Sequence, residues 1–216
     1  MIYKRKNHSN LIINLFVTIV FGFILFFFSL NSYLKLFAEE KKLFEIEDYF
    51  NSIRTLESEF VQESYTSLIS TGTFFLKKPG KFRFSYNPPT KLEVVSHLQA
   101  VLVFDPKNNR TGPLTYPISS SPFKYLLEDK FEISSKSFSK ISTQEDILFV
   151  ELNLGNEGKN SLTLKLNKNP IKLTGWELEN NFGEVTKVFL SNIRVNRYVS
   201  DQIFNLDEDY KILKNR

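Results

Sequence analysis

The sequence predicts a mainly β domain, a long antiparallel meander with one helix before it and a short helix in its middle. Between Glu39 and Ser58, apolar residues such as Ile46, Phe50 and Ile53 recur at three- and four-residue steps, as in an amphipathic helix. Much of the following chain alternates apolar and polar residues at the period of a β-strand. A long series of such strands closes into a barrel or curls into a half-barrel, because a flat sheet exposes long unpaired edges.

Residues 1–38 have the features of an export signal. Lys4, Arg5 and Lys6 precede an apolar run of about residues 11–30, and the small residue Ala38 follows. This order is typical of a secretory signal peptide. The apolar run is also close to the ~20 residues that span a bilayer, so an uncleaved inner-membrane anchor is a second interpretation. Both interpretations place residues 39–216, expected to form a single domain, in the periplasm.

The charge of the chain also belongs to this leader. The formal net charge is +4, from 28 basic and 24 acidic residues. Residues 1–38 carry four basic residues and no acidic one, so residues 39–216 hold 28 − 4 = 24 basic residues against 24 acidic ones. The body is therefore formally neutral and has no basic stripe that could follow a phosphate backbone. Nucleic acid is excluded as the expected partner.

The segment Gly72–Pro89 is expected to form a hairpin with one aromatic face. Its two alternating runs are joined by Lys78–Lys81, in which Pro79 presets φ and Gly80 accepts a positive φ. The pair Pro88–Pro89 ends the second strand, since proline has no N–H to donate to a ladder. Alternation places five apolar side chains on one face of the hairpin: Phe74, Leu76, Phe82, Phe84 and Tyr86.

The remaining elements follow from the same signals. A short helix is expected at Ser121–Glu128, where Pro122 occupies the first turn and apolar residues share one side. Residues 207–216 form a charged tail, expected to fray. The expected strands are Phe60–Tyr65, Gly72–Lys77, Lys81–Tyr86, Leu92–Ser96, Val101–Asp105, Ile147–Leu154, Ser161–Leu166, Ile171–Glu179, Glu184–Ser191 and a last short one at Ile203–Leu206.

No residue pattern points to catalysis. Beyond the leader, His97 is the single histidine, and it lies in an expected turn with no nucleophile elbow beside it. Neither metal-ligand spacing nor a glycine-rich phosphate loop occurs. The chain has no cysteine, so neither disulfides nor a lipid-modified N-terminal cysteine is expected. We therefore expect a binding protein with no enzymatic activity and no cofactor.

Together with its flanks, the hairpin resembles the LolA family of periplasmic outer-membrane lipoprotein carriers. The resemblance rests on the order and spacing of short motifs over roughly residues 40–206. It departs from the family at Lys78, where arginine is common, and at His97–Leu98, where an Asp-Gly turn is common. The motifs are LESEFVQ (Leu56–Gln62), GTFFLKKP (Gly72–Pro79), KFRF (Lys81–Phe84), Pro89, VVS (Val94–Ser96), VLVFDP (Val101–Pro106), PFKYLL (Pro122–Leu127), GWE (Gly175–Glu177), FGEVT (Phe182–Thr186) and IFNL (Ile203–Leu206).

This resemblance implies an incompletely closed, strongly curved antiparallel β-barrel, with the N-terminal and middle helices as a lid over a hydrophobic cavity. It implies a monomeric chaperone that takes acylated lipoproteins from an inner-membrane ABC release complex to an outer-membrane acceptor. By analogy with the family, Lys78 and Arg83 are expected to act in closure or transfer. The residues expected to line the acyl-chain cavity are Phe50, Ile53, Phe60, Phe74, Leu76, Phe82, Phe84, Tyr86, Val94, Leu102, Phe104 and Leu126.

Two other interpretations stay open. An apolar sheet face is often ordinary core, so the aromatic wall could be filled by the domain's own side chains. A protein of the same fold, anchored by an uncleaved leader, could bind or sense lipids or lipoproteins without carrying them. A carrier would have to offer a large apolar surface. Burying a ~16-carbon chain is worth on the order of 12 kcal/mol, at roughly 0.8 kcal/mol per methylene.

Overall fold

The computed structural model describes residues 21, 23, 25–30, 33, 40–97, 99–105, 107, 112–133, 138–154 and 160–205. The chain divides into two compact units, Met1–Phe44 and Glu45–Arg216. Among the described residues, no helix is both long and apolar enough to cross a bilayer. Most of the expected signal peptide, and the charged tail of residues 207–216, lie outside the described residues.

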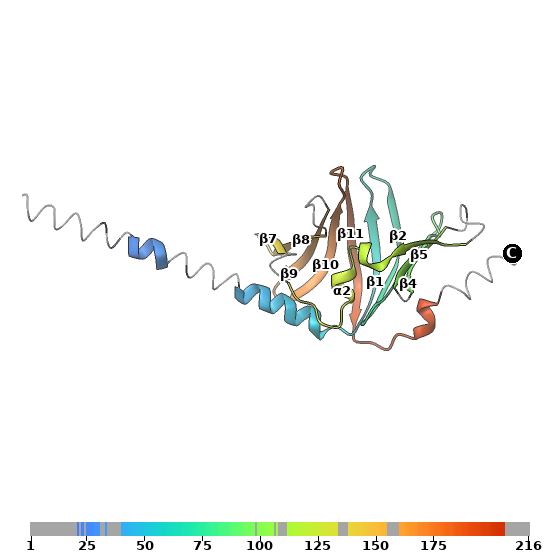
Figure 1. Ribbon diagram of the computed structural model, residues 1–216, viewed down its shortest axis with the longest axis horizontal. Coiled ribbons are helices and arrows are strands. Elements are labelled where there is room, and N and C mark those ends of the chain that lie inside the picture. Colours follow the sequence, from blue (N-terminus) through green and yellow to red (C-terminus); the bar gives the residue numbers. More distant parts are fainter. Residues whose placement is uncertain are drawn as a thin grey trace, which may run out of the picture. The chain divides into compact units, whose positions relative to one another are not determined.

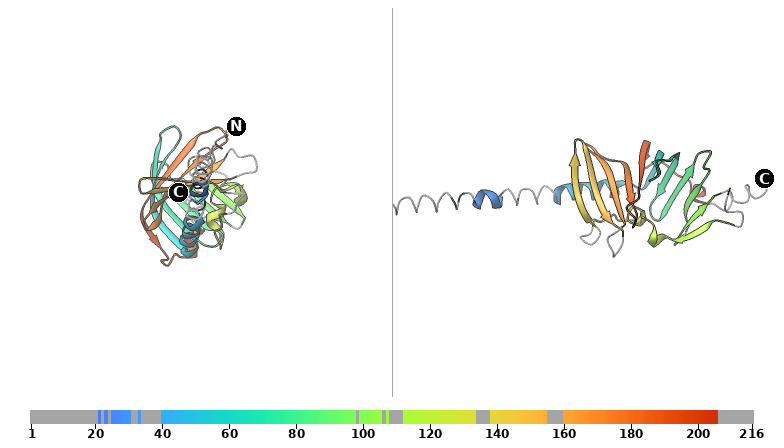
Figure 2. Two further views of the ribbon diagram at one scale, coloured as in Figure 1. Left: turned by 90° about the vertical axis from the view of Figure 1, so that its left-hand side faces the viewer. Right: turned by 90° about the horizontal axis from the view of Figure 1, so that it is seen from above.

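The second unit is built around one antiparallel sheet of eleven strands (Figure 1). Their order is β6-β5-β4-β3-β2-β1-β11-β10-β9-β8-β7, so β6 and β7 form two separate edges. The sheet is curved but not closed (Figure 2), which confirms the incompletely closed barrel. The strands are β1 Thr55–Glu63, β2 Ile69–Lys77, β3 Lys81–Tyr86, β4 Glu93–His97, β5 Ala100–Phe104, β6 Leu114–Pro117, β7 Phe138–Gln144, β8 Ile147–Asn153, β9 Ser161–Lys168, β10 Ile171–Glu179 and β11 Val185–Val195.

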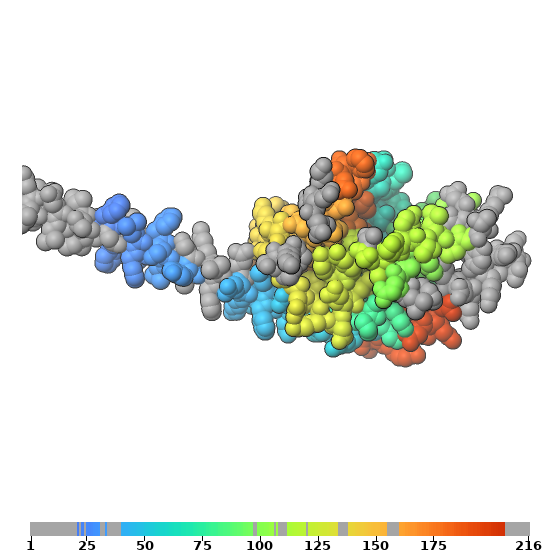
Figure 3. Space-filling model, in the orientation of Figure 1, coloured from blue at the N-terminus to red at the C-terminus, as the bar shows by residue number. Residues whose placement is uncertain are grey.

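The helical elements cover the two faces of this sheet. Residues 40–52 are helical, and the connection from β6 to β7 contains η1 (Ile118–Ser120) and α2 (Lys124–Leu127). Because β6 and β7 lie at opposite edges, this connection crosses the sheet, and α2 lies in front of the central strands in Figure 1. Its yellow-green surface covers the middle of the face shown in Figure 3. A second 3-10 helix, η2 (Asp201–Phe204), follows β11.

Two sequence predictions of elements are wrong, and two strands were missed. The first helix ends at residue 52, not at Ser58, because Thr55–Glu63 pairs with both β2 and β11. The predicted strand Ile203–Leu206 is occupied by η2 through Phe204. Strands β6 and β7 were not predicted, since all of β6 is exposed and neither shows a regular apolar alternation. Pairing with β5 and β8 creates them, and this pairing depends on residues outside each segment.

The inner face of the sheet forms one apolar core. Alternate residues of the central strands point inward, as the period-two pattern predicts. The helical elements complete this core from the open side. Its buried members are Ile46, Phe50, Ile53, Leu56, Phe60, Phe74, Leu76, Phe82, Phe84, Val101, Phe123, Leu126, Leu127, Phe131, Leu148, Val150, Leu152, Leu162, Leu164, Leu166, Leu173, Trp176 and Val188.

Gly72 allows two aromatic side chains to pack across β2. It lies opposite Phe60 in one ladder and Tyr86 in the other. A Cβ at this position would lie 2.7 Å from the Phe60 ring and closer still to the Ser85 carbonyl oxygen. We expect Gly72→Ala to lower the free energy of unfolding by about 3 kcal/mol in urea denaturation. Thr73→Ala, on the other face of β2, is the control and should lower the free energy of unfolding by less than about 1 kcal/mol. Equal losses in the two variants would contradict this packing.

Candidate functional site

The predicted aromatic wall forms on the inner face of β1, β2 and β3. The rings of Phe74 and Phe84 are stacked, with centroids 4.5 Å apart. The Phe60 ring packs edge-on against the rings of Phe84 and Tyr86, with centroids 5.5 and 5.0 Å away. The Tyr86 hydroxyl donates to Gln62 at 2.8 Å, and burial raises the pKa of this phenol to about 12. The structure therefore brings the hairpin side chains together as alternation predicts, and their contact with acyl chains stays a prediction.

Phe123, at the N-terminus of α2, occupies the centre of this wall. Its ring centroid lies 5.6 Å from Phe82, 5.4 Å from Phe84 and 5.2 Å from Trp176 of β10. Phe123 is only 8% exposed and Trp176 only 1%. The wall is thus covered by a side chain of the β6–β7 connection, so the structure holds it in a closed and filled state.

A small apolar gap remains beside the aromatic wall. Its volume is about 10 Å³, which is room for about one water molecule. An acyl chain can enter this region only if the residues of the covering connection move away. Five of the predicted cavity residues, from the end of the first helix, β2 and α2, meet here. The gap is lined by Phe50, Ile53, Leu56, Phe74, Leu76, Lys78, Leu126 and Leu173.

The structure corrects two predicted cavity residues. Leu102 and Phe104 of β5 belong to a separate apolar cluster on the outer face, whereas Val101 and Val94 pack against the inner core. The error has a physical cause. The run from Val101 to Phe104 is apolar throughout, because η2 and its neighbours cover its outer face as the core covers its inner one. A strand apolar on both faces carries no alternation that could indicate its orientation.

Lys78 connects the β2–β3 turn to the end of the first helix. It is only 9% exposed, and its Nζ donates to the Phe50 carbonyl oxygen at 2.9 Å. That carbonyl lies near a helix C-terminus, where the macrodipole favours a cation. Burial lowers the pKa of the Lys78 amine, and the nearby Arg54 charge lowers this pKa further. Lys78 is therefore a buried residue of the closed site and not a solvated turn lysine.

Hydrogen bonds between distant segments hold the covering connection in place. The Asn51 side chain contacts Phe131 twice: Nδ2 donates to its carbonyl oxygen at 3.0 Å, and Oδ1 accepts from its N–H at 2.7 Å. The Gly80 N–H donates to the Leu127 carbonyl oxygen at 2.9 Å, which ties the β2–β3 turn to α2. The helix and the turn therefore close the open side of the sheet through a few polar contacts.

The sequence that forms this half-barrel and its cover matches a known protein family. The model of the family described as "Outer membrane lipoprotein carrier protein LolA" matches residues 51–207. The chain belongs to the LolA family. This match spans most of the curved sheet and the connection that covers it, so the family resemblance read from the motifs is confirmed.

Some relatives of this LolA-family chain are described as lipoprotein carriers. An outer-membrane lipoprotein carrier protein of Methylococcus capsulatus is 27% identical over 179 residues, covering 77% of this chain and 84% of the relative. An uncharacterised protein of Rickettsia prowazekii is 25% identical, covering 77% and 80%. Among solved structures, a LolA superfamily protein of Nitrosomonas europaea is 12% identical, covers 77% of this chain and 99% of its own, and has a TM-score of 0.45.

Arg83, predicted to act with Lys78, lies on the opposite face of the sheet. Its Nε donates to Glu93 at 2.9 Å and its Nη1 donates to the Ile203 carbonyl oxygen at 2.7 Å. The neighbouring turn lysines, Lys77 and Lys81, contact Asp201 at 2.8 and 2.9 Å, and these hydrogen bonds lower the pKa of this carboxyl to about 2. Arg83 therefore fastens η2 to the outer face, and the structure does not bring it to the cavity.

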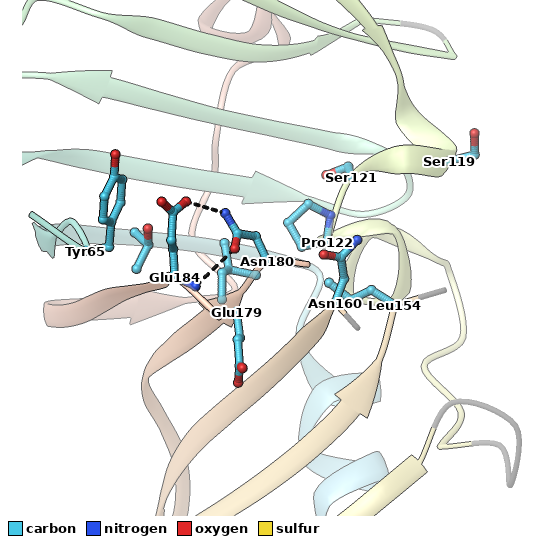
Figure 4. A pocket seen from close by; sticks show the side chains of 11 residues that line it. Tyr65, Ser119, Ser121, Pro122, Leu154, Asn160, Glu179, Asn180 and Glu184 are labelled. Atoms are coloured by element: carbon cyan, nitrogen blue, oxygen red, sulfur yellow. Dashed lines mark hydrogen bonds between the residues drawn. The ribbon is translucent and has the colours of Figure 1, made fainter. Parts of the chain in front are cut away.

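A second, polar pocket of about 600 Å³ opens beside the covering connection (Figure 4). The Asn180 amide donates to Glu184 at 2.7 Å and orients this carboxylate within the pocket. None of the predicted site residues is among those described as lining it. They are Tyr65, Ser119, Ser121, Pro122, Leu154, Asn160, Leu178, Glu179, Asn180, Glu184 and Thr186.

Several residues of the closed site were missing from the predicted set. Phe123 and Trp176 are central to the wall, and Asn51 holds the connection closed. Phe123 follows Pro122 on the apolar side of the predicted short helix, and this signal could have added it to the list. A polar residue such as Asn51 gives no such signal, because its partner lies 80 positions away in the chain.

The lowered pKa of Lys78 has a consequence for stability at alkaline pH. Because the folded-state pKa lies below the ordinary value of 10.5, the unfolded chain binds more protons between the two values. The charged amine therefore opposes folding below its folded pKa, and this penalty is relieved as the pH rises toward 10.5. We expect the free energy of unfolding of the wild type to rise relative to Lys78→Met over that range, measured by urea denaturation. If the free energies of unfolding of the two proteins change with pH in parallel, this expectation is contradicted.

Proposed function

We propose that this protein is a periplasmic chaperone that binds the acyl chains of lipoproteins and carries them from the inner to the outer membrane. The observation that supports it best is the way in which the aromatic wall is covered. The cover is formed by side chains of the connection between two sheet edges, and not by a second sheet. Such a cover can be exchanged for a ligand without breaking any ladder of the sheet. Family membership and the names of the relatives support the same function.

The exchange explains how a carrier can both hold and release a lipid. Phe123, Leu126 and Leu127 are buried when the site is closed, and each contributes about 1.5–3 kcal/mol by burial. An incoming chain gains roughly 0.8 kcal/mol per methylene but displaces these side chains. The net binding free energy is therefore smaller than the burial of the chain alone. A carrier of this kind can pass its cargo to an acceptor.

The partners follow from the same energetics. Extraction of acyl chains from a bilayer into this site is close to neutral, so loading needs an outside energy source. We assign that role to an inner-membrane ABC release complex, and unloading to an outer-membrane lipoprotein acceptor. The body of the chain is formally neutral, so its net charge provides no overall attraction to anionic headgroups. The protein acts as a carrier and not as an enzyme.

The most direct test is what the protein carries in a cell. We expect the full chain, expressed in a host with an outer membrane and purified from the periplasm, to retain acylated proteins. Mass spectrometry after denaturation identifies them, and a periplasmic protein without acyl chains, purified in parallel, is the control. Recovery of the chain free of acylated protein and of phospholipid would contradict the proposal.

We propose that Lys78 contributes to closure or to transfer, because it joins the β2–β3 turn to the first helix beside the gap. Lys78→Leu removes the hydrogen bond to the Phe50 carbonyl oxygen while keeping an apolar stem. We expect at least a several-fold slower release of bound lipoprotein to acceptor membranes. Lys81→Leu is the matched control, since that lysine contacts Asp201 on the outer side. Unchanged release by the Lys78 variant would count against this role.

A further inference from the structure

Two polar atoms inside the apolar core have no hydrogen-bond partner among the described residues. They are the hydroxyl Oγ of Ser58 and the indole Nε1 of Trp176. Ser58 is only 2% exposed and Trp176 only 1%. A buried donor without an acceptor has lost its hydration with no replacement, and such groups are rare in folded proteins. Two of them on one inner face therefore call for a physical reason.

Both atoms belong to the same part of the candidate site. Ser58 lies on the inner face of β1, directly opposite Phe74 in the β1–β2 ladder. Trp176 of β10 packs edge-on against the same ring, with centroids 5.5 Å apart and an interplanar angle of 68°. The Trp176 indole also packs edge-on against Phe123, the side chain that fills the wall, at 5.2 Å. Removal of Phe123 from the wall therefore takes away one of the rings that pack against the indole.

We propose that Ser58 and Trp176 are the polar binding points of the acyl site, and that they donate hydrogen bonds to carbonyl oxygens of the ester or amide groups that attach acyl chains to the cargo. This inference rests on the proposed function. An acyl chain brings only methylenes to the aromatic wall, and its attachment carbonyl is its one strong acceptor. The indole N–H is a donor only, and the serine hydroxyl donates equally well to a carbonyl.

A purely structural role explains these two residues less well. Buried tryptophan nitrogens usually find a partner, and a phenylalanine at 176 would fill much of the space without a stranded N–H. Alanine at 58 would likewise remove a buried hydroxyl that bonds nothing in the closed state. A site with two unpaired donors favours a ligand with acceptors over an equally long hydrocarbon, because the hydrocarbon leaves the donors unpaired.

Two probes that differ by a single carbonyl test this inference. The ester 1-palmitoylglycerol and the ether 1-O-hexadecylglycerol have the same chain length and the same glycerol group. Their affinities for the full chain are measured by displacement of a fluorescent apolar dye. We expect the wild type to prefer the ester by about 10-fold, and Trp176→Phe and Ser58→Ala each to reduce that preference by about 3-fold or more. Affinity for the ether should fall less than affinity for the ester in both variants.

The stability of the ligand-free variants separates binding from structure. Because its hydroxyl is unpaired in the closed state, Ser58→Ala should not lower the urea midpoint, whereas Trp176→Phe should lower it only by the cost of the buried volume it removes. Tyr86→Phe is the matched control, since it removes a hydroxyl that is paired with Gln62, and its midpoint should fall. Equal binding of ester and ether by the wild type, or equal weakening of both probes in the variants, would overturn the inference and leave the carrier function standing. A wild type that binds neither probe would contradict the carrier function itself.

Discussion

The pairing of β1 with β11 is the constraint on which the rest of the structure depends. It joins the first and last strands of the series in the middle of the sheet. As a result β6 and β7, which follow one another in the chain, lie at opposite edges, and the connection between them must cross the inner face. This connection carries Phe123, Leu126 and Leu127 into the core. An open sheet with a cover made of loop and short helix is thus a consequence of strand order.

The cover is held by contacts of a different kind from those that hold the sheet. The sheet is stabilised by continuous ladders, whereas the cover depends on apolar side chains and a few hydrogen bonds from Asn51 and Gly80. Apolar contacts are not directional, so an acyl chain can replace them at comparable free energy. In the proposed function, closure and cargo binding therefore use the same chemistry, and the site would exchange one apolar filling for another.

The outer face shows why parts of the site could not be predicted. η2 covers the outer side of β3–β5, where Arg83 and the turn lysines fasten it. Both faces of β5 are buried as a result, and the apolar run Val101–Phe104 gives no sign of which residues point inward. The predicted orientation of Leu102 and Phe104 failed for this reason. In β2 and β3, where polar residues mark the outer face, the predicted inner residues are the buried ones.

The sequence by itself determined the mainly β class, the position of the hairpin and the set of its side chains that share a face. These follow from local rules, since the side-chain period of a strand and the turn preferences of proline and glycine act over a few residues. Only the tertiary structure decided that Phe123 fills the aromatic wall, that Lys78 is buried against a helix end, and that Ser58 and Trp176 stay unpaired. Each of these depends on segments far apart in the chain, and no local pattern records which segments will meet.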